Sequence, residues 1–219
     1  MLKGTGWGSS TALRRAFDLL AAGLGLLLLA PVLLAIALWV RLDSPGPALF
    51  RQTRVGQGGR LFRIRKFRTM GVAHSPEESG SLEVTIGNDP RITRAGRFLR
   101  RCKLDELPQL LDVVQGHMAL VGPRPEVPQH VGHWPPALRE RILAVRPGLT
   151  DPASLAFADE AERLARAADP AREYREVITP AKLAMSARYL DERSLASDLR
   201  LILTTLARLR PRLTPRADA

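Results

Sequence analysis

The sequence has only one cysteine, Cys102, so it cannot form an internal disulfide, as is typical of a protein of a reducing compartment. Its four histidines are scattered, and neither they nor Cys102 have the spacing of a zinc site. Aromatic residues make up only 5% of the chain, which lacks the interleaved aromatic and basic residues of single-stranded nucleic-acid surfaces. These shortages argue against a disulfide scaffold, a zinc protein and a nucleic-acid partner.

Acidic residues are also scarce relative to basic ones. The 219 residues include 33 Lys and Arg against 22 Asp and Glu, which gives a formal net charge of +11. Such a charge suits anionic lipids, phosphorylated substrates or nucleic acids. A long apolar run near the N-terminus favours the first two, and the remaining length is that of one domain.

The apolar run covers residues 19–40, which contain no charged side chain over 22 positions. At about 1.5 Å per residue, a helix of this length just crosses a bilayer core of about 30 Å. Pro31 lies in its middle, where it removes a helical hydrogen bond and kinks or breaks the helix. Both flanks are basic, with Arg14 and Arg15 before and Arg41 after, so the positive-inside bias favours neither orientation.

A helix that enters the membrane, turns at Ala30 and Pro31 and returns to the same face satisfies both observations. We therefore expect a flexible N-terminus over residues 1–11, a re-entrant membrane helix hairpin over 12–42 and a catalytic domain over 43–219. One kinked transmembrane helix is the alternative. The domain is predicted to be α/β but mainly helical, with a small β-hairpin, and to lie at the membrane surface.

Two strands, 48–55 and 60–70, are predicted to form that hairpin around the glycine-rich segment 56–59. Side chains alternate along a strand, so Lys66 shares a face with Phe62 and Ile64 and is the one cation on the more apolar side. The pattern makes Lys66 a candidate phosphate ligand, with a solvated edge lysine as the alternative.

Asp105 and Glu106 are two adjacent carboxylates in a strongly basic stretch. A basic helix capped by Thr93 is expected over 93–103, and it brings Arg100 just ahead of them. A second helix is expected over 106–115, with Asp105 as its N-cap. Helix dipole and neighbouring cations would lower the pKa of Asp105. An ionised carboxylate in a basic pocket can attack phosphorus or hold Mg²⁺. Alone, however, the pair could be an ordinary helix cap.

Two arginine-proline turns follow this pair. Arg124 stands between two prolines that restrict its backbone, so a fixed guanidinium could bind phosphate at low entropic cost. The segment from Arg146 to Thr150 offers a second candidate of the same kind.

The C-terminal third is predicted to be helical. Helix-period apolar residues mark 159–168 and 170–190, and a leucine stripe with nearby arginines marks 195–209. That last stripe suits either an anionic membrane surface or packing against the domain core. The polar segment 74–88 has no periodicity and is expected to be a loop.

The motifs, in this order, resemble the bacterial sugar transferases that act as monotopic phosphoglycosyl transferases, in their minimal form. They are Arg15-Ala16-Phe17-Asp18, Phe50-Arg51-Gln52-Thr53-Arg54-Val55-Gly56, Arg65-Lys66-Phe67-Arg68-Thr69-Met70, Leu104-Asp105-Glu106-Leu107-Pro108-Gln109, Val121-Gly122-Pro123-Arg124-Pro125 and Arg146-Pro147-Gly148-Leu149-Thr150. The resemblance implies transfer of a sugar 1-phosphate from a UDP-sugar to polyprenyl (undecaprenyl) phosphate at the cytoplasmic face of the bacterial inner membrane. It also implies a requirement for Mg²⁺ and an aspartate nucleophile at Asp105. After Thr150 the chain departs from the pattern of many members, which bears on sugar specificity.

The predicted site thus has Asp105 as nucleophile and metal ligand, with Glu106 as a base or as the group that orients Asp105. Four cations and one hydroxyl in these motifs are predicted to bind phosphate: Lys66, Arg100, Arg124, Arg146 and Thr150. A lipid-phosphate phosphatase and a non-catalytic membrane scaffold are the alternative functions. Direct transfer without a covalent intermediate, and homodimerisation, are left open.

Overall fold

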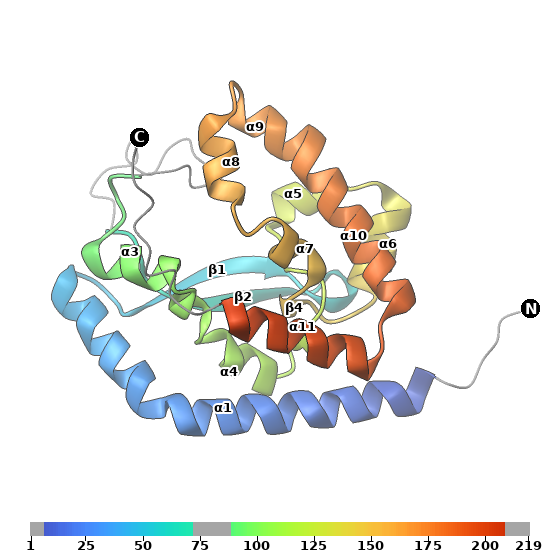
Figure 1. The fold of residues 1–219 in the computed structure, drawn as a ribbon, viewed down its shortest axis with the longest axis horizontal. Coiled ribbons are helices and arrows are strands. Elements are labelled where there is room, and N and C mark those ends of the chain that lie inside the picture. The colour runs from blue at the N-terminus through green and yellow to red at the C-terminus, as the bar shows by residue number, and fades with distance from the viewer. Residues whose placement is uncertain (1–6, 72–88, 209–219) are drawn as a thin grey trace, which may run out of the picture.

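The computed structural model describes residues 7–71 and 89–208, which form one mainly helical body around two small sheets (Figure 1). The predicted loop 74–88 lies outside the described residues. The strands are β1 (Leu49–Val55), β2 (Leu61–Phe67), β3 (Ala119–Val121) and β4 (Gly148–Thr150). The α-helices are α1 (Trp7–Asp43), α3 (Arg94–Arg101), α4 (Gln109–Val114), α5 (Pro128–Gly132), α6 (Pro136–Leu143), α7 (Pro152–Ala156), α8 (Glu160–Arg166), α9 (Pro170–Glu173), α10 (Thr179–Glu192) and α11 (Leu195–Arg208). Shorter turns are the 3₁₀ segments η1 (Gln57–Gly59) and η2 (Leu104–Glu106) and the π segment η3 (Tyr174–Ile178).

Helix α1 is a single helix that contains Pro31. Figure 1 shows that it is bent but does not fold back on itself, so the structure does not confirm the predicted hairpin with its apex at Ala30 and Pro31. A proline removes one helical hydrogen bond and bends a helix, while the residues on either side keep theirs. The helix begins at Trp7, so it includes residues 7–11 of the predicted N-terminal segment.

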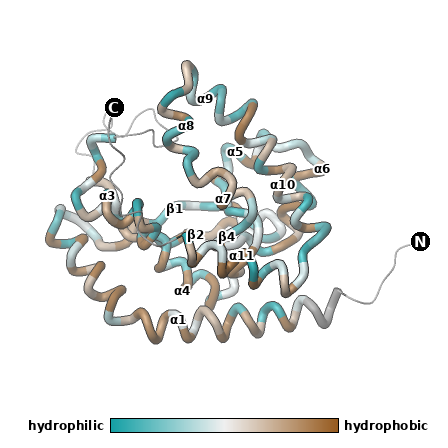
Figure 2. Tube along the Cα trace, in the orientation of Figure 1, coloured by the Kyte–Doolittle hydropathy of each residue, from teal (hydrophilic) through white to brown (hydrophobic). Residues whose placement is uncertain are grey.

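One side of α1 packs on the domain along most of its length. The packed residues recur at helical spacing and belong to two core clusters: Phe17, Ala21, Ala22, Leu26, Leu29, Leu33, Ile36, Ala37 and Val40. They contact α4, β3 and α3. The opposite side exposes large apolar side chains, which give α1 its brown colour in Figure 2: Leu13, Leu20, Leu24, Leu27, Leu28, Leu34, Leu38 and Leu42.

The C-terminal end of α1 is held by Arg68, a buried arginine that directly follows β2. Arg68 donates from its guanidinium to the Val40 carbonyl at 3.2 Å, to the Ser44 carbonyl at 2.8 Å and to the Pro47 carbonyl at 2.7 Å. A cation at a helix C-terminus satisfies carbonyls that have no helical partner. The turn that leaves α1 is therefore held against the end of β2.

The β1–β2 hairpin is confirmed, and it is antiparallel with Phe50 opposite Lys66. Phe62 and Ile64 are buried against α1 and α4, as the alternation predicts. The second strand ends at Phe67 instead of reaching residue 70, and Met70 makes only an isolated bridge with Ile92. Lys66 lies near the end of β2, on the same face as Phe62 and Ile64, and this strand contacts η2.

A second sheet, of the parallel strands β3 and β4, was not expected from the sequence. It requires a close approach between Gly122 and Gly148, because a Cβ on Gly148 would lie 2.1 Å from the Gly122 nitrogen. Three-residue strands carry too little alternation to be recognised from their pattern. The sheet determines where the segment carrying Arg124 begins.

The helical tail is confirmed, with differences in detail. The predicted helix 170–190 is divided into α9, the π segment η3 and α10. Helix α11 follows the predicted amphipathic segment, and its apolar stripe is divided between the core and the surface. Ile202 packs against the central core, whereas Leu199, Leu203 and Leu206 are exposed.

Candidate active site

Asp105 and Glu106 lie in the 3₁₀ turn η2, between α3 and α4. Lys103, which precedes the turn, has a positive φ of 56° and reverses the chain after α3. Helix α3 is capped by Thr93 as predicted. Asp105, however, is not the N-cap of a helix over 106–115, because α4 begins only at Gln109.

Asp105 is buried, with 8% of its surface exposed, and its Oδ1 has no hydrogen-bond partner among the described residues. Burial raises the pKa of Asp105, and the Glu106 charge raises it further, against smaller opposing contributions from Lys66, Lys103 and Arg100. The sequence predicted a lowered pKa, which is wrong because burial and the Glu106 charge outweigh the nearby cations. A buried carboxylate oxygen without a partner is available for a metal ion or for attack.

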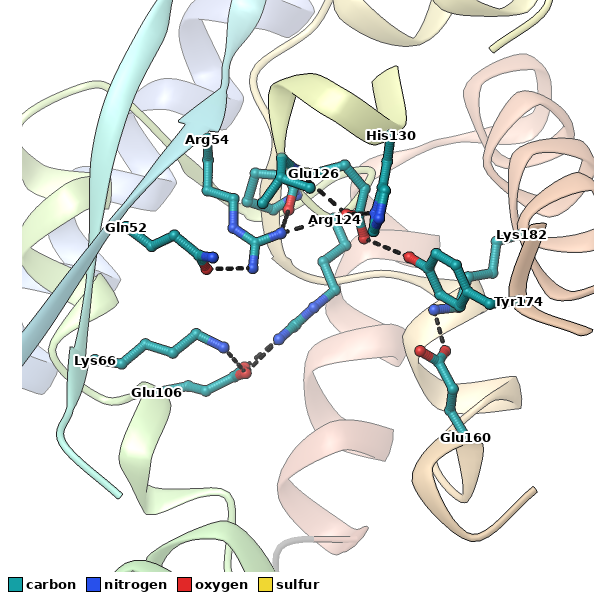
Figure 3. Close-up of polar contacts among 12 residues, drawn as sticks. Gln52, Arg54, Lys66, Glu106, Arg124, Glu126, His130, Glu160, Tyr174 and Lys182 are labelled. Atoms are coloured by element: carbon teal, nitrogen blue, oxygen red, sulfur yellow. Dashed lines mark hydrogen bonds and ion pairs between the residues drawn. The ribbon is translucent and has the colours of Figure 1, made fainter. Parts of the chain in front are cut away.

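Glu106 is paired with two cations (Figure 3). Lys66 Nζ donates to Oε1 at 2.9 Å, and the Arg124 guanidinium donates to Oε2 at 3.1 Å and also to Oε1. Burial raises the pKa of Glu106, but the charges and hydrogen bonds of Arg124 and Lys66 outweigh it and hold the pKa well below its usual range. Such a carboxylate is a weak base, so the geometry favours an orienting role over proton transfer.

The loop that carries Arg124 is pinned at both ends. Gly148 N–H donates to the Pro123 carbonyl at 3.0 Å, and Val55 N–H donates to the Glu126 carbonyl at 2.9 Å. Together with the flanking prolines, these bonds limit the freedom of the Arg124 backbone. The guanidinium is thus directed at Glu106 from a rigid support.

Of the predicted phosphate ligands, Lys66, Arg100 and Arg124 gather around Asp105 and Glu106. Arg100 donates from Nε to Thr69 Oγ1 at 3.1 Å, and its charge acts on Asp105. These three cations come from β2, α3 and the loop after β3, so the site joins three separate parts of the domain.

Arg146 and Thr150 are not part of this cluster. Arg146 donates from Nε to the Gly116 carbonyl at 3.1 Å, at the C-terminal end of α4 and not at the end near Asp105. Arg15 donates to the Val113 carbonyl at 2.8 Å at the same helix end. Thr150 Oγ1 lies 2.7 Å from Thr205 Oγ1 on α11. The structure gives Arg146 and Thr150 contacts that stabilise the fold.

A polar network beside Arg124 was missed by the sequence analysis. Glu126 accepts from Arg54 at 3.3 Å and from the Tyr174 hydroxyl at 3.2 Å, and its Oε2 lies 3.2 Å from His130 Nδ1. Burial raises the pKa of Glu126, but the His130 hydrogen bond and the Arg54 charge outweigh it and lower the pKa to about 2. The available signal was the position of Glu126 directly after the Pro-Arg-Pro turn.

This network predicts a pH-dependent contribution to stability. A carboxylate whose pKa falls from 4.5 unfolded to about 2 folded stabilises the protein above pH 4.5, and this stabilisation is lost as the pH falls through 2. Glu126→Gln should therefore lower the melting temperature in detergent at pH 7 by about 3–10 °C. The difference from wild type should shrink between pH 4.5 and the lowest accessible pH. A difference that stays constant over that range would contradict an ionic role for Glu126.

Comparison with known proteins decides the family. The sequence pattern described as "Bacterial sugar transferase" matches residues 9–211. The chain belongs to the bacterial sugar transferase family. It is 39% identical over 203 residues to the exopolysaccharide production protein PSS of Rhizobium leguminosarum bv. phaseoli, and the matched region covers 89% of this chain and 93% of that protein.

Other relatives of this sugar transferase are larger. It is 48% identical over 139 residues to the UDP-glucose:undecaprenyl-phosphate glucose-1-phosphate transferase of Caulobacter vibrioides, covering 63% of this chain and 51% of that one. It is 45% identical over 145 residues to the protein of the same description from Escherichia coli K12, and the match covers 65% of this chain and 31% of that protein. The matched region thus spans about half and about a third of the length of these two relatives.

Proposed function

We propose that this sugar transferase moves a sugar 1-phosphate from a UDP-sugar to undecaprenyl phosphate, releases UMP, and thereby starts a glycan on its lipid carrier. The observation that carries the proposal is the buried Asp105 carboxylate, whose Oδ1 is unpartnered among the described residues and lies within the influence of Lys66, Lys103 and Arg100. The names of the relatives, which specify UDP-sugar donors and undecaprenyl phosphate, support the same reaction.

The proposed chemistry has two steps. An Asp105 oxygen attacks the sugar-proximal phosphorus, the bond from that phosphorus to the bridging oxygen breaks, and UMP leaves with the electron pair. A phosphate oxygen of the lipid then attacks the same phosphorus and breaks its bond to Asp105, which regenerates the carboxylate. Lys66 and Arg124 hold Glu106 next to Asp105. The same two cations can also donate to the substrate phosphates, which offsets the repulsion between the anionic reactants.

The residues fit the Mg²⁺ ion that we propose as cofactor. The described residues contain no group of three His, Cys, Asp or Glu able to hold a metal. Mg²⁺ is commonly held by one or two carboxylates together with substrate phosphates and water, so Asp105 Oδ1 would suffice as the protein ligand. When bound, Mg²⁺ would neutralise phosphate charge and lower the cost of ionising Asp105. Glu106 is less suited as a ligand because both its oxygens accept from cations.

We also propose that α1 lies in the cytoplasmic leaflet of the inner membrane and does not cross it. The domain packs along α1 from Phe17 to Val40, so a spanning α1 would draw the adjoining charged surfaces into the hydrocarbon, at high cost. An α1 parallel to the surface leaves its exposed leucines in lipid and the domain in water. The bend at Pro31 would let the helix dip into the leaflet with both ends on one side. This arrangement places the site where a lipid phosphate emerges.

Cysteine labelling tests this placement. In a Cys102→Ser background, single cysteines at Ser9 and Arg60 should both react with a membrane-impermeant maleimide in inverted vesicles, and neither should react in intact spheroplasts. Residues 9 and 60 flank α1's apolar run, so a same-side result means that the run does not cross. Reaction of the Ser9 position from the periplasmic side would establish a spanning helix.

The reaction class is tested by incubating the purified protein with Mg²⁺, undecaprenyl phosphate and each of a panel of UDP-sugars. UMP release that continues only with both substrates supports the transferase. Sustained release of UMP with water as the only acceptor would instead identify a hydrolase, and no release with any donor would reject the proposed function.

A further inference from the structure

A pocket lies beside Arg124, the residue that donates to Glu106. Its lining includes Arg124, Trp134, Ser154, Tyr174, Lys182 and Ser186, which come from the Pro-Arg-Pro loop and from helices of the C-terminal half. Figure 3 shows Arg124 between two groups of side chains, with Lys66 and Glu106 on one side and Tyr174, Lys182 and Glu160 on the other. Arg124, whose guanidinium donates to Glu106, therefore also lines this pocket.

Two polar atoms in the lining lack partners. Among the described residues, Trp134 Nε1 and Ser154 Oγ are buried and make no hydrogen bond. Trp134 is only 7% exposed. Buried polar groups are nearly always satisfied by protein, water or ligand, so an unpaired indole N–H and an unpaired hydroxyl on one pocket indicate a polar occupant.

The walls are fixed before any ligand arrives. Asp151 accepts from the Ser154 N–H at 2.7 Å and from the Ser186 hydroxyl at 3.4 Å, which holds α7 against α10. Lys182 is paired with Glu160, and its Nζ lies 5.6 Å from the centroid of the Tyr174 ring. The Tyr174 hydroxyl is itself held by Glu126. A preformed site of this kind gives up little entropy on binding.

We propose that this pocket binds the hexose of the UDP-sugar, an inference that rests on the proposed function. The proposed reaction places the sugar-proximal phosphorus at Asp105. The hexose, which is joined directly to that phosphorus, then lies next to the Arg124 side chain. A hydroxylated ring matches the lining, which combines an aromatic face with hydroxyl, indole and ammonium groups. Residues 151–154, where the sequence departs from the family pattern, supply Ser154 and the Asp151 brace. The pocket therefore sets which sugar is accepted.

Donor binding is measured by calorimetry with Mg²⁺, using the full chain in detergent with Asp105→Asn to prevent turnover. The probes are UDP, UDP-glucose, UDP-galactose and their two N-acetyl counterparts. The ratio of UDP-sugar affinity to UDP affinity isolates the contribution of the hexose. Ser154→Ala and Trp134→Phe, which remove a hydroxyl and an N–H but keep the packing, should each lower that ratio for the preferred sugar by about two- to tenfold. UDP affinity should not change.

Thr53→Ala, which removes an exposed hydroxyl from β1, is the matched control and should leave the ratio unchanged. An equal weakening of UDP and UDP-sugar binding in the Ser154 and Trp134 variants would assign the pocket to the nucleotide and overturn the proposal. Unchanged binding in both variants, or a parent that binds no UDP-sugar more tightly than UDP, would also overturn it. Failure of the proposed function has a different signature, because in that case the wild-type protein, with Asp105 intact, would release no UMP from any donor.

Discussion

Replacing Asp105 by asparagine is expected to reduce UMP release at least about a thousandfold, because an amide keeps the shape of the side chain but cannot form an acyl phosphate. The fold should be retained. Burial raises the pKa of the Asp105 carboxyl, so its ionised form costs stability at neutral pH, and the variant should melt at the same temperature as wild type or higher. Initial rates and melting curves, both in detergent, give the two readouts. Retention of more than a few per cent of the activity would remove Asp105 from the role of nucleophile.

The same variant separates covalent from direct transfer. Wild-type protein mixed with Mg²⁺ and a UDP-sugar alone should release one UMP per active site in a burst and gain the mass of one sugar phosphate, whereas Asp105→Asn should do neither. Intact-protein mass spectrometry after rapid quench measures the adduct. A wild-type protein that stays unmodified at the earliest times would favour direct attack by the lipid phosphate. Asp105 would then be left as a metal ligand.

The second large effect is expected at Arg124. Arg124→Ala should lower kcat/KM by about a hundredfold or more, because it removes a fixed guanidinium from the phosphates and leaves Glu106 with Lys66 as its cation. Thermal stability should fall less than activity does. The measurement is the rate of UMP release at varied donor concentration.

Arg146→Ala is the matched control, since the sequence alone assigns both arginines to phosphate binding. Arg146 donates to the Gly116 carbonyl at the end of α4, so its loss should lower the melting temperature while kcat/KM stays within about threefold of wild type. Equal losses of activity in the two variants would return Arg146 to the active site.

The residues that sequence alone placed correctly are those with a local pattern. The position of Lys66 on the same face of β2 as Phe62 and Ile64 was predicted because strand alternation has a period of two. Thr93 was found because it precedes a helix with a capping side chain. Both signals are contained within a few neighbouring residues.

The errors concern features that depend on distant contacts. The sequence could not place Arg146 relative to Asp105, because its position follows from the parallel pairing of β3 with β4, which are too short to show a pattern. Tyr174 was missed because its partner, Glu126, lies 48 residues away in the chain. The pKa of Asp105 was predicted in the wrong direction because burial depends on the whole surrounding structure, whereas capping depends on the next few residues.

Because α1 supplies buried side chains to two core clusters, α1 and the rest of the described domain form one folding unit. Removing residues 7–43 would uncover Phe62, Val113 and Leu99 instead of releasing a water-soluble enzyme. During synthesis α1 leaves the ribosome before the other described elements, and its inner stripe stays incompletely covered until α3 and α4 have been made. With α1 placed in lipid as we propose, lipid insertion and completion of the core are coupled, and the candidate active site assembles on a helix that is already at the membrane.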